Sequence, residues 1–210
     1  MLNLHRNLKT IEPNQALIGR DKPLINSEKN FINGRSLNGP WPSEFKVAIF
    51  ALGCFWGAER LFWNIDGVYM TSVGYAGGFS PNPTYEEVCS GNTGHAEAVQ
   101  IVYDSNSCSY SALLKIFFES HNPTQGMRQG NDKGTQYRSM ILFLTNEQKN
   151  EAIKIKNLYS EKLLEHGFNS ITTEIKQLTS YYLAEIYHQQ YLSKNPNGYC
   201  GLDGTGIKCP

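Results

Sequence analysis

The pattern of hydrophobic and polar positions changes abruptly at Cys54. Residues 47–52 form an unbroken apolar run typical of a strand buried on both faces, although a buried helical segment has the same pattern. Gly53 breaks the run, and from Phe55 onward the apolar residues follow helical spacing. Cys54 is therefore predicted at a strand-to-helix junction, where free N–H groups and the helix dipole favour an anion. That position predicts a lowered pKa and a reactive thiolate, whereas a lone cysteine is more often a buried core residue.

Further elements follow along the chain. Strands are expected at residues 68–75, 96–103, 139–144 and 171–178, and helices at residues 84–88, 110–120, 145–166 and 183–192. Residues 145–148 have the sequence of a capping box. The order β-α-β-β-α-β over residues 47–144 predicts a ferredoxin-like split βαβ core. The expected fold class is α+β, a two-layer sandwich with extra helices and a long coil C-terminal tail.

The two ends of the chain have little periodicity. Residues 1–45 are interrupted by prolines, and we expect an extended arm that wraps the domain. Residues 46–194 hold the predicted elements and are expected to form the catalytic domain. The glycine-rich residues 195–210 are expected to be a mobile tail. The polar loop 121–137 is long for a compact domain, and such loops are often functional.

Composition narrows the class of protein. The 210 residues suffice for one domain with a sizeable core. The chain has 19 Lys and Arg residues and 19 Asp and Glu residues, so it has no excess of positive charge that would attract nucleic acid or an anionic membrane. The N-terminus lacks the apolar core of a signal peptide, and no apolar run approaches the ~20 residues that cross a bilayer. We expect a soluble, cytoplasmic monomer that binds neither nucleic acid nor membrane.

The strand predicted at residues 96–103 places a carboxylate among large apolar side chains. Its alternation puts Glu97 on the same face as Val99, Ile101 and Tyr103. Burial on such a face would raise the pKa of Glu97 and keep it protonated near neutral pH. From spacing alone, a carboxylate that points into water at a strand edge fits equally well.

Five cysteines, an odd number, stand at scattered positions, which argues against a disulfide scaffold. In a reducing compartment such cysteines are expected to be buried, catalytic or metal-binding. Cys89 and Cys108 lie in or beside predicted elements and are expected to pack as small apolar residues. Cys200 and Cys209 lie in the glycine-rich tail, which would let them travel.

Several ordered segments together resemble a known family. They are Gly53-Cys-Phe-Trp-Gly57, Gly74-Tyr-Ala-Gly-Gly78, Pro81-Asn-Pro-Thr-Tyr-Glu-Glu-Val-Cys89, Gly91-Asn-Thr-Gly-His-Ala-Glu-Ala98, Asp132-Lys-Gly-Thr-Gln-Tyr-Arg138 and Ala184-Glu-Ile-Tyr-His-Gln-Gln-Tyr-Leu192. This set resembles the A-type peptide methionine sulfoxide reductases over roughly residues 47–200. The first 45 residues resemble the N-terminal extension of the longer bacterial members.

The resemblance implies reduction of the S epimer of methionine sulfoxide, free and in proteins, as repair of oxidative damage. A sulfoxide sulfur becomes a good electrophile only when its oxygen accepts a proton or strong hydrogen bonds. The resemblance assigns Cys54 as nucleophile and Glu97 as proton donor. It assigns Tyr85 and Tyr137 as phenols that bind the oxygen, and Asp132 as a polar residue that supports the same pocket.

The resemblance also implies an apolar slot and a relay of thiols. Phe55 and Trp56 would form the slot for the substrate methyl group, favoured by aromatic–sulfur contact. Attack by Cys54 would leave a sulfenic acid. Cys200 and then Cys209 would resolve it, and thioredoxin would complete the cycle. No metal and no cofactor are expected.

Two other functions are disfavoured by the sequence. A thiol peroxidase or disulfide oxidoreductase is disfavoured because the chain has no C-x-x-C motif and the Cys54 context is apolar. A zinc module built from His188, Cys200 and Cys209 is disfavoured because structural zinc ligands usually pair at short spacing. His95 lies near the Glu97 motif and suggests a base, but sulfoxide reduction needs no acyl-transfer base, so we interpret it as structural.

Overall fold

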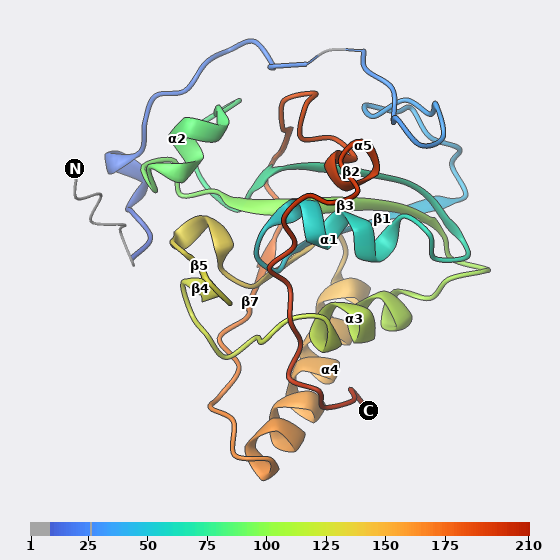
Figure 1. The fold of residues 1–210 in the computed structure, drawn as a ribbon, viewed down its shortest axis with the longest axis vertical. Helices are drawn as coiled ribbons and strands as arrows, with labels where there is room; N and C mark the ends of the chain where they lie inside the picture. Colours follow the sequence, from blue (N-terminus) through green and yellow to red (C-terminus); the bar gives the residue numbers. More distant parts are fainter. Residues whose placement is uncertain (1–8, 26) are drawn as a thin grey trace.

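A six-stranded mixed sheet lies at the centre of the computed structural model, which describes residues 9–25 and 27–210 (Figure 1). The strand order is β7-β6-β1-β3-β2-β8. The bounds are β1 Phe45–Ala51, β2 Val68–Ala76, β3 Ala96–Asp104, β6 Met140–Phe143, β7 Glu174–Gln177 and β8 Tyr181–Leu183. A separate two-stranded sheet pairs β4 (Arg128–Gln129) with β5 (Asp132–Lys133).

The four central strands have the predicted split βαβ topology. Strand β3 lies between β1 and β2 and is antiparallel to both, while β6 is antiparallel to β1 on the other side. The predicted α+β, ferredoxin-like core is therefore confirmed. The sheet is extended by β7, which is parallel to β6 and is reached through helix α4 (Asn146–Glu165). At the opposite edge, β8 pairs antiparallel with β2.

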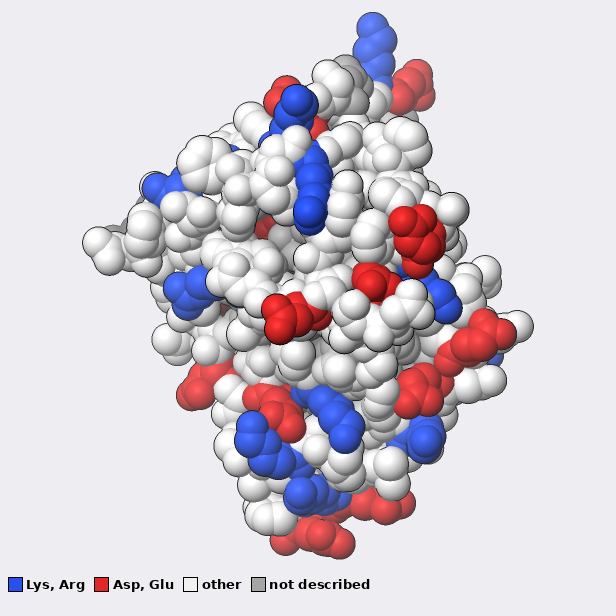
Figure 2. Space-filling model, turned by 90° about the vertical axis from the view of Figure 1, so that its right-hand side faces the viewer, with Lys and Arg blue, Asp and Glu red and all other residues white. Residues whose placement is uncertain are grey.

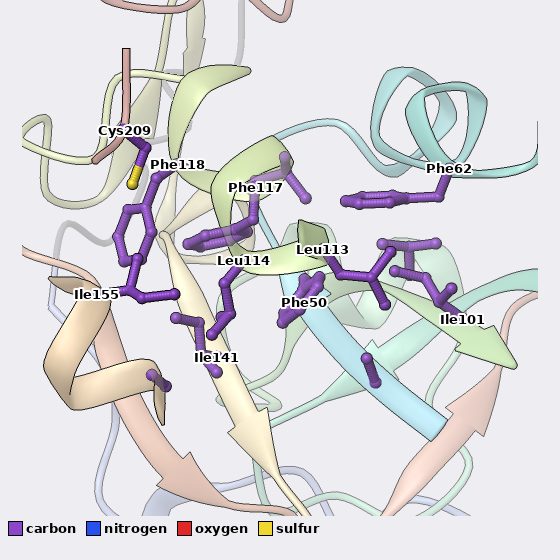
Figure 3. Packing of buried hydrophobic residues seen from close by; sticks show 14 of the residues in the cluster. Phe50, Phe62, Ile101, Leu113, Leu114, Phe117, Phe118, Ile141, Ile155 and Cys209 are labelled. Atoms are coloured by element: carbon purple, nitrogen blue, oxygen red, sulfur yellow. The ribbon is translucent and has the colours of Figure 1, made fainter. Parts of the chain in front are cut away.

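Three helices cover one face of the sheet: α1 (Phe55–Phe62), α3 (Tyr110–Glu119) and α4 (Figure 1). The main hydrophobic core lies between these helices and the sheet. Phe50 of β1 packs against Phe62 of α1 and Phe117 of α3, with ring centroids 5.9 and 5.1 Å away (Figure 3). Burial of these apolar side chains is the main force that holds the helices on the sheet.

The second face of the sheet is covered in part by the N-terminal arm. Among the described residues 9–25 and 27–44, the regular structure consists of one 3₁₀ turn (Pro13–Gln15) and one isolated bridge. Leu37 is buried against Met70 of β2 and Val102 of β3. The side-chain amide of Asn30 donates to the carbonyl of Thr71 at 2.8 Å. The arm is thus attached by packing and side-chain bonds, and residues 1–8 lie outside the described part of the chain.

The prediction of a helix at residues 183–192 is wrong. The segment contains the end of β8, an irregular stretch, and the short helix α5 (Tyr191–Lys194). The side chain of Gln189 accepts from the N–H of Val73 and donates to its carbonyl, so it replaces a strand partner at the edge of β2. Gln190 adopts a left-handed conformation with φ of 47°, which no α-helix accommodates. Tertiary hydrogen bonds therefore override the helical spacing.

Other expectations are corrected in detail. Thr145 caps α4 by accepting from the N–H of Gln148, but the Gln148 side chain accepts from Leu144 and donates to Val47, so the capping box is only half formed. The loop 121–137 contains β4, β5 and the 3₁₀ turn η2 (Thr135–Tyr137).

Charged side chains of both signs are interspersed on the face shown in Figure 2. This mixture agrees with the equal numbers of acidic and basic residues in the sequence. Within the described residues, no helix is long and apolar enough to cross a bilayer.

Candidate active site

The strand-to-helix junction is built as the sequence predicts. Strand β1 ends at Ala51, α1 begins at Phe55, and Cys54 is the N-cap residue. Gly53 has a φ of 106°, a conformation that strains any residue with a side chain. A Cβ atom there would also lie 2.7 Å from Cγ of Gln129. Gly53 thus lets the chain turn tightly under the β4–β5 hairpin and deliver Cys54 to the helix terminus.

Cys54 opens into a cavity of about 160 Å³. Its lining residues come from six elements: Cys54, Phe55 and Trp56 at the start of α1, Tyr85 of helix α2 (Tyr85–Cys89), Glu97 of β3, Asp132 of β5, Tyr137 of η2 and Tyr199 of the tail. All seven residues predicted for the nucleophile, the proton donor and the substrate pocket therefore line one cavity. Tyr199 was not predicted.

A larger cavity of about 650 Å³ lies between the start of α3 and the start of α4. The residues that line it include Tyr103, Tyr110 and Leu144, and among the described residues its lining has no cysteine or histidine. Volume alone would favour this cavity, but the smaller one holds a thiol beside a buried carboxyl group.

Glu97 is buried at the base of the small cavity. One of its carboxylate oxygens accepts from the backbone N–H of Phe55 at 2.9 Å, which ties β3 to the first turn of α1. Burial raises the pKa of Glu97 to about 8, against the opposing effect of that hydrogen bond. At neutral pH most of Glu97 is therefore protonated, and its O–H is available as a donor.

The pKa of Cys54 differs from the sequence-based prediction. Burial raises it well above the usual range, and the nearby charge of Glu97 raises it further. The backbone N–H groups of Trp56 and Gly57 lower it, as a helix terminus should, but they do not offset burial. The predicted lowering of the Cys54 pKa is therefore wrong. Because the Glu97 charge is one of the causes, a proton on Glu97 favours the Cys54 thiolate.

The hydroxyl groups of Tyr85 and Tyr137 remain protonated and can donate hydrogen bonds. Burial raises the pKa of Tyr85 and of Tyr137. The backbone N–H of Tyr85 donates to Glu185 at 2.9 Å, and Glu185 also accepts from the hydroxyl of Tyr75 at 2.8 Å. Glu185 therefore fixes the start of α2 against β2 and the neighbouring loop.

Arg138, the residue after Tyr137, fixes the other phenol-bearing turn. Its buried guanidinium donates to the carbonyl oxygens of Thr135 and Gly94, each at 2.8 Å. These bonds join η2 to the loop that leads into β3 and Glu97. Both phenols thus lie in short helical segments that are anchored by polar side chains, the buried Arg138 and the partly buried Glu185.

Comparison with known proteins agrees with this arrangement. The sequence model of the peptide methionine sulfoxide reductase family matches residues 46–207. Peptide methionine sulfoxide reductase MsrA of Brucella anthropi is 57% identical, over 93% of this chain and 90% of its own. The mitochondrial peptide methionine sulfoxide reductase of Bos taurus is 54% identical, over 96% of this chain and 87% of its own. This chain belongs to that family.

A solved structure supports the same conclusion. Methionine sulfoxide reductase A of Corynebacterium diphtheriae has a TM-score of 0.87 and 44% identity, covering 96% of this chain and 98% of its own. The enzyme described here, a peptide methionine sulfoxide reductase by family, therefore shares both sequence and fold with its relatives across nearly the whole chain.

The aromatic wall of the cavity in this reductase is held by His188. The indole N–H of Trp56 donates to Nδ1 of His188 at 3.0 Å, and Trp56 stacks on Tyr191 at 3.9 Å between ring centroids. The His188 ring also packs against Phe55 and Tyr85. Burial lowers the pKa of His188 to about 4, so the ring is neutral and Nδ1 accepts the indole proton.

His95 lies in a different environment. Its Nδ1 accepts from the N–H of Gly78, and its Nε2 bonds the carbonyl of Ser80. Burial lowers the pKa of His95 to about 4. It joins two loops of the fold, and both ring nitrogens are used in doing so.

Tyr199 of the tail lines the cavity, and the tail then runs past α1 and across the helices (Figure 1). The hydroxyl of Tyr199 donates to Asp132 at 3.3 Å. Cys200 is half-buried and lies against Gly57 of α1. Further along, the Gln129 side chain donates to the carbonyl of Asp203 at 3.3 Å.

Cys209 is buried at the far end of the tail, in the core between α3 and α4 (Figure 3). Its backbone N–H donates to Glu119 at 2.8 Å, and Lys208 pairs with the same carboxylate at 2.7 Å. The hydroxyl of Tyr159 bonds Thr205 at 2.8 Å. The tail expected to be mobile is thus docked here, and Cys209 can reach another thiol only after these contacts break.

The sequence did not predict several residues of the site. Arg138, Glu185 and His188 lie within segments that carry the family resemblance, so their surroundings gave a signal, but their buried partners could not be inferred from spacing. Tyr199 precedes Cys200 in a segment without periodicity. Among the described residues, no three His, Cys, Asp or Glu side chains are grouped as a metal site.

Proposed function

We propose that this protein reduces the S epimer of methionine sulfoxide to methionine, both as the free amino acid and within oxidised proteins. The observation that carries the proposal is the cavity in which the Cys54 thiol faces the same space as a protonated Glu97, two phenols and the rings of Phe55 and Trp56. That combination matches what a sulfoxide needs: a sulfur nucleophile, donors for its oxygen and an apolar slot for its methyl group.

The chemical step follows from these positions. The sulfoxide oxygen accepts hydrogen bonds from Tyr85 and Tyr137 and a proton from Glu97, which makes the sulfur electrophilic. Cys54 attacks as the thiolate, having lost its proton. An S–S bond forms between Cys54 and the substrate, and the substrate S–O bond breaks as its oxygen leaves as water, with one proton from Glu97 and one from the thiol. A water molecule then attacks the Cys54 sulfur, the S–S bond breaks, methionine leaves, and Cys54 becomes a sulfenic acid. The proton that this water releases restores Glu97, so atoms and charge balance.

Cys200 and Cys209 complete the cycle in this proposal. The Cys200 thiol attacks the sulfenic sulfur, which expels water and forms a Cys54–Cys200 disulfide. Cys209 then attacks Cys200, releases Cys54 and leaves a disulfide in the tail. The dithiol of thioredoxin reduces that disulfide. The position of Cys200 beside α1 supports the first exchange, whereas the second requires the tail to undock.

The proposal includes the setting in which these thiols work. We propose that residues 46–194 act as the catalytic domain, residues 1–45 as a wrapping arm and residues 195–210 as a tail that moves during recycling. Thiol exchange suits a reducing compartment, and we propose a cytoplasmic monomer that repairs oxidised proteins.

The test is incubation of the protein with racemic methionine sulfoxide and dithiothreitol, followed by chiral analysis of the remaining sulfoxide. We expect the S epimer to be consumed and the R epimer to remain, because separate enzymes handle the two epimers. Consumption of both at similar rates would contradict the proposal. Equal activity towards hydrogen peroxide would instead support a thiol peroxidase.

A further inference from the structure

Gly57 lies close to the sulfur atom of Cys54 and to that of Cys200. Its backbone N–H is one of the two that face the Cys54 thiol. A Cβ atom built on Gly57 would lie only 2.8 Å from Sγ of Cys200 and 3.2 Å from two side-chain atoms of Leu202. These separations are well below ordinary van der Waals contact. The tail therefore fills the space that a side chain at this position would need.

The backbone conformation does not explain a glycine here. Gly57 lies in the first turn of α1 and, unlike Gly53, is not among the residues with positive φ. Glycine within a helix is less favourable than alanine, because it orders a more flexible chain. Helix α1 would thus be more stable in isolation with alanine at this position. What glycine provides is room on the surface of the helix.

The Cys200 thiol is also held from the other side. Leu202 packs at the edge of the main core and reaches Gly57 and Gly53. Tyr199 is bonded to Asp132 across the cavity mouth. Tyr199, which precedes Cys200, and Leu202, two residues after it, are therefore both held in place, and the thiol lies against the bare surface at Gly57.

We propose that Gly57 is a positioning residue for the resolving step: its missing side chain forms a notch in α1 that seats the Cys200 thiol beside Cys54. The inference rests on the proposed function, but it concerns the step after methionine is released. In that step the Cys200 sulfur bonds to the Cys54 sulfur, the S–O bond of the sulfenic acid breaks, and water leaves. A methyl group in the notch would hold Cys200 away without touching the substrate pocket.

The experiment compares wild type with Gly57→Ala in a single turnover without reductant. Methionine release and formation of the Cys54–Cys200 disulfide are followed separately, the second by intact mass after a sulfenic-acid trap. We expect release of about one methionine per enzyme at nearly the wild-type rate, because alanine keeps the backbone N–H that faces Cys54 and the substitution leaves the Cys54 and Glu97 side chains in place. Disulfide formation should slow by about 10²-fold, the cost of misplacing a reacting group by about 1 Å. Arg60→Ala, on the exposed face of α1, is the matched control and should change neither step.

A second pair of variants isolates the contact with sulfur. In a Leu202→Ala background the two 3.2 Å contacts are gone, and the methyl group of Gly57→Ala meets mainly the Cys200 thiol. We expect the double variant to form the disulfide much more slowly than Leu202→Ala alone. The inference would be overturned if the double variant and Leu202→Ala formed the disulfide at the same rate, or if Gly57→Ala formed it at the native rate. Loss of methionine release in Gly57→Ala alone would also overturn it. Absence of methionine release from wild type would instead refute the proposed function.

Discussion

Cys54 and Cys209 have the same exposure but opposite surroundings. Each is 8% exposed, and burial raises the pKa of both thiols, that of Cys209 to about 11. Cys54 faces a cavity, two backbone N–H groups and a protonated carboxyl. Cys209 faces the apolar core under α3 and α4, and its backbone is tied to Glu119. Burial therefore does not distinguish a reactive thiol from a packed one.

The difference lies in what each thiol can meet without a change in the fold. Cys54 is reached by any substrate that enters the cavity, and Glu97 beside it can supply the proton. Cys209 meets only packed side chains until the tail leaves the helices. In the proposed mechanism, Cys54 reacts where it lies, whereas Cys209 must first be released from the core. Variants of each thiol and of its neighbours test this contrast.

The largest effect is expected from Cys54→Ser. The variant should release no methionine with any reductant, because among the described residues no other cysteine lines the cavity. Cys200→Ser is the matched control and should release about one methionine per enzyme and then stall as the sulfenic acid. Methionine per enzyme is measured by chromatography. Turnover by Cys54→Ser would show that the nucleophile is misassigned.

Glu97→Gln should lower the rate of methionine release by about 10²–10⁴-fold, the usual contribution of general acid catalysis. The amide keeps the size of the side chain and donates a weaker hydrogen bond, so the fold should persist by circular dichroism. Glu165→Gln, at an exposed position of α4, should keep the native rate. A native rate in Glu97→Gln would make Glu97 a structural carboxylate.

The same substitution should change how stability depends on pH. Folded Glu97 keeps its proton up to about pH 8, whereas an ordinary glutamate has a pKa of 4.5. The folded state thus binds more protons than the unfolded state between these values, so this group makes the free energy of unfolding fall as pH rises through that window. Glu97→Gln should therefore gain stability relative to wild type as pH rises from 5 to 8. Urea denaturation of both proteins at pH 5 and pH 8 measures the free energies of unfolding. An equal change with pH in wild type and Glu97→Gln would exclude a raised pKa of Glu97.

The smallest effects are expected at the tail. Cys209→Ser should turn over normally with dithiothreitol and more slowly with thioredoxin.

Glu119→Ala removes the acceptor of the Cys209 N–H and the partner of Lys208. A hydrogen bond of this kind is worth about 1 kcal/mol, so the undocked fraction should rise by about fivefold. Iodoacetamide labelling of Cys209, read by peptide mass, should rise by that factor while labelling of Cys54 stays constant. Equal labelling of Cys209 in both proteins would show that Glu119 does not hold the tail.

The sequence by itself determined the features that depend on near neighbours. Periodicity placed β1, β2 and β3 and the junction at Cys54, and the local sequence placed the cap at Thr145, because apolar spacing and capping act over a few residues. The alternation of β3 put Glu97 on the apolar face that the structure buries. The family resemblance brought in Tyr85, Asp132 and Tyr137, which spacing alone did not single out.

Only the tertiary structure decided the features that depend on contacts between distant segments. Burial set the pKa of Cys54 above its usual range, although the helix terminus alone predicts the opposite. The side chains of Gln189 and Gln190 bond β2 and Glu59, and these bonds prevent a helix that the local spacing favours. The docking of Cys209 against α3 and α4 likewise followed from the packing of the core. In each case the free energy comes from groups far apart in sequence, which no local pattern records.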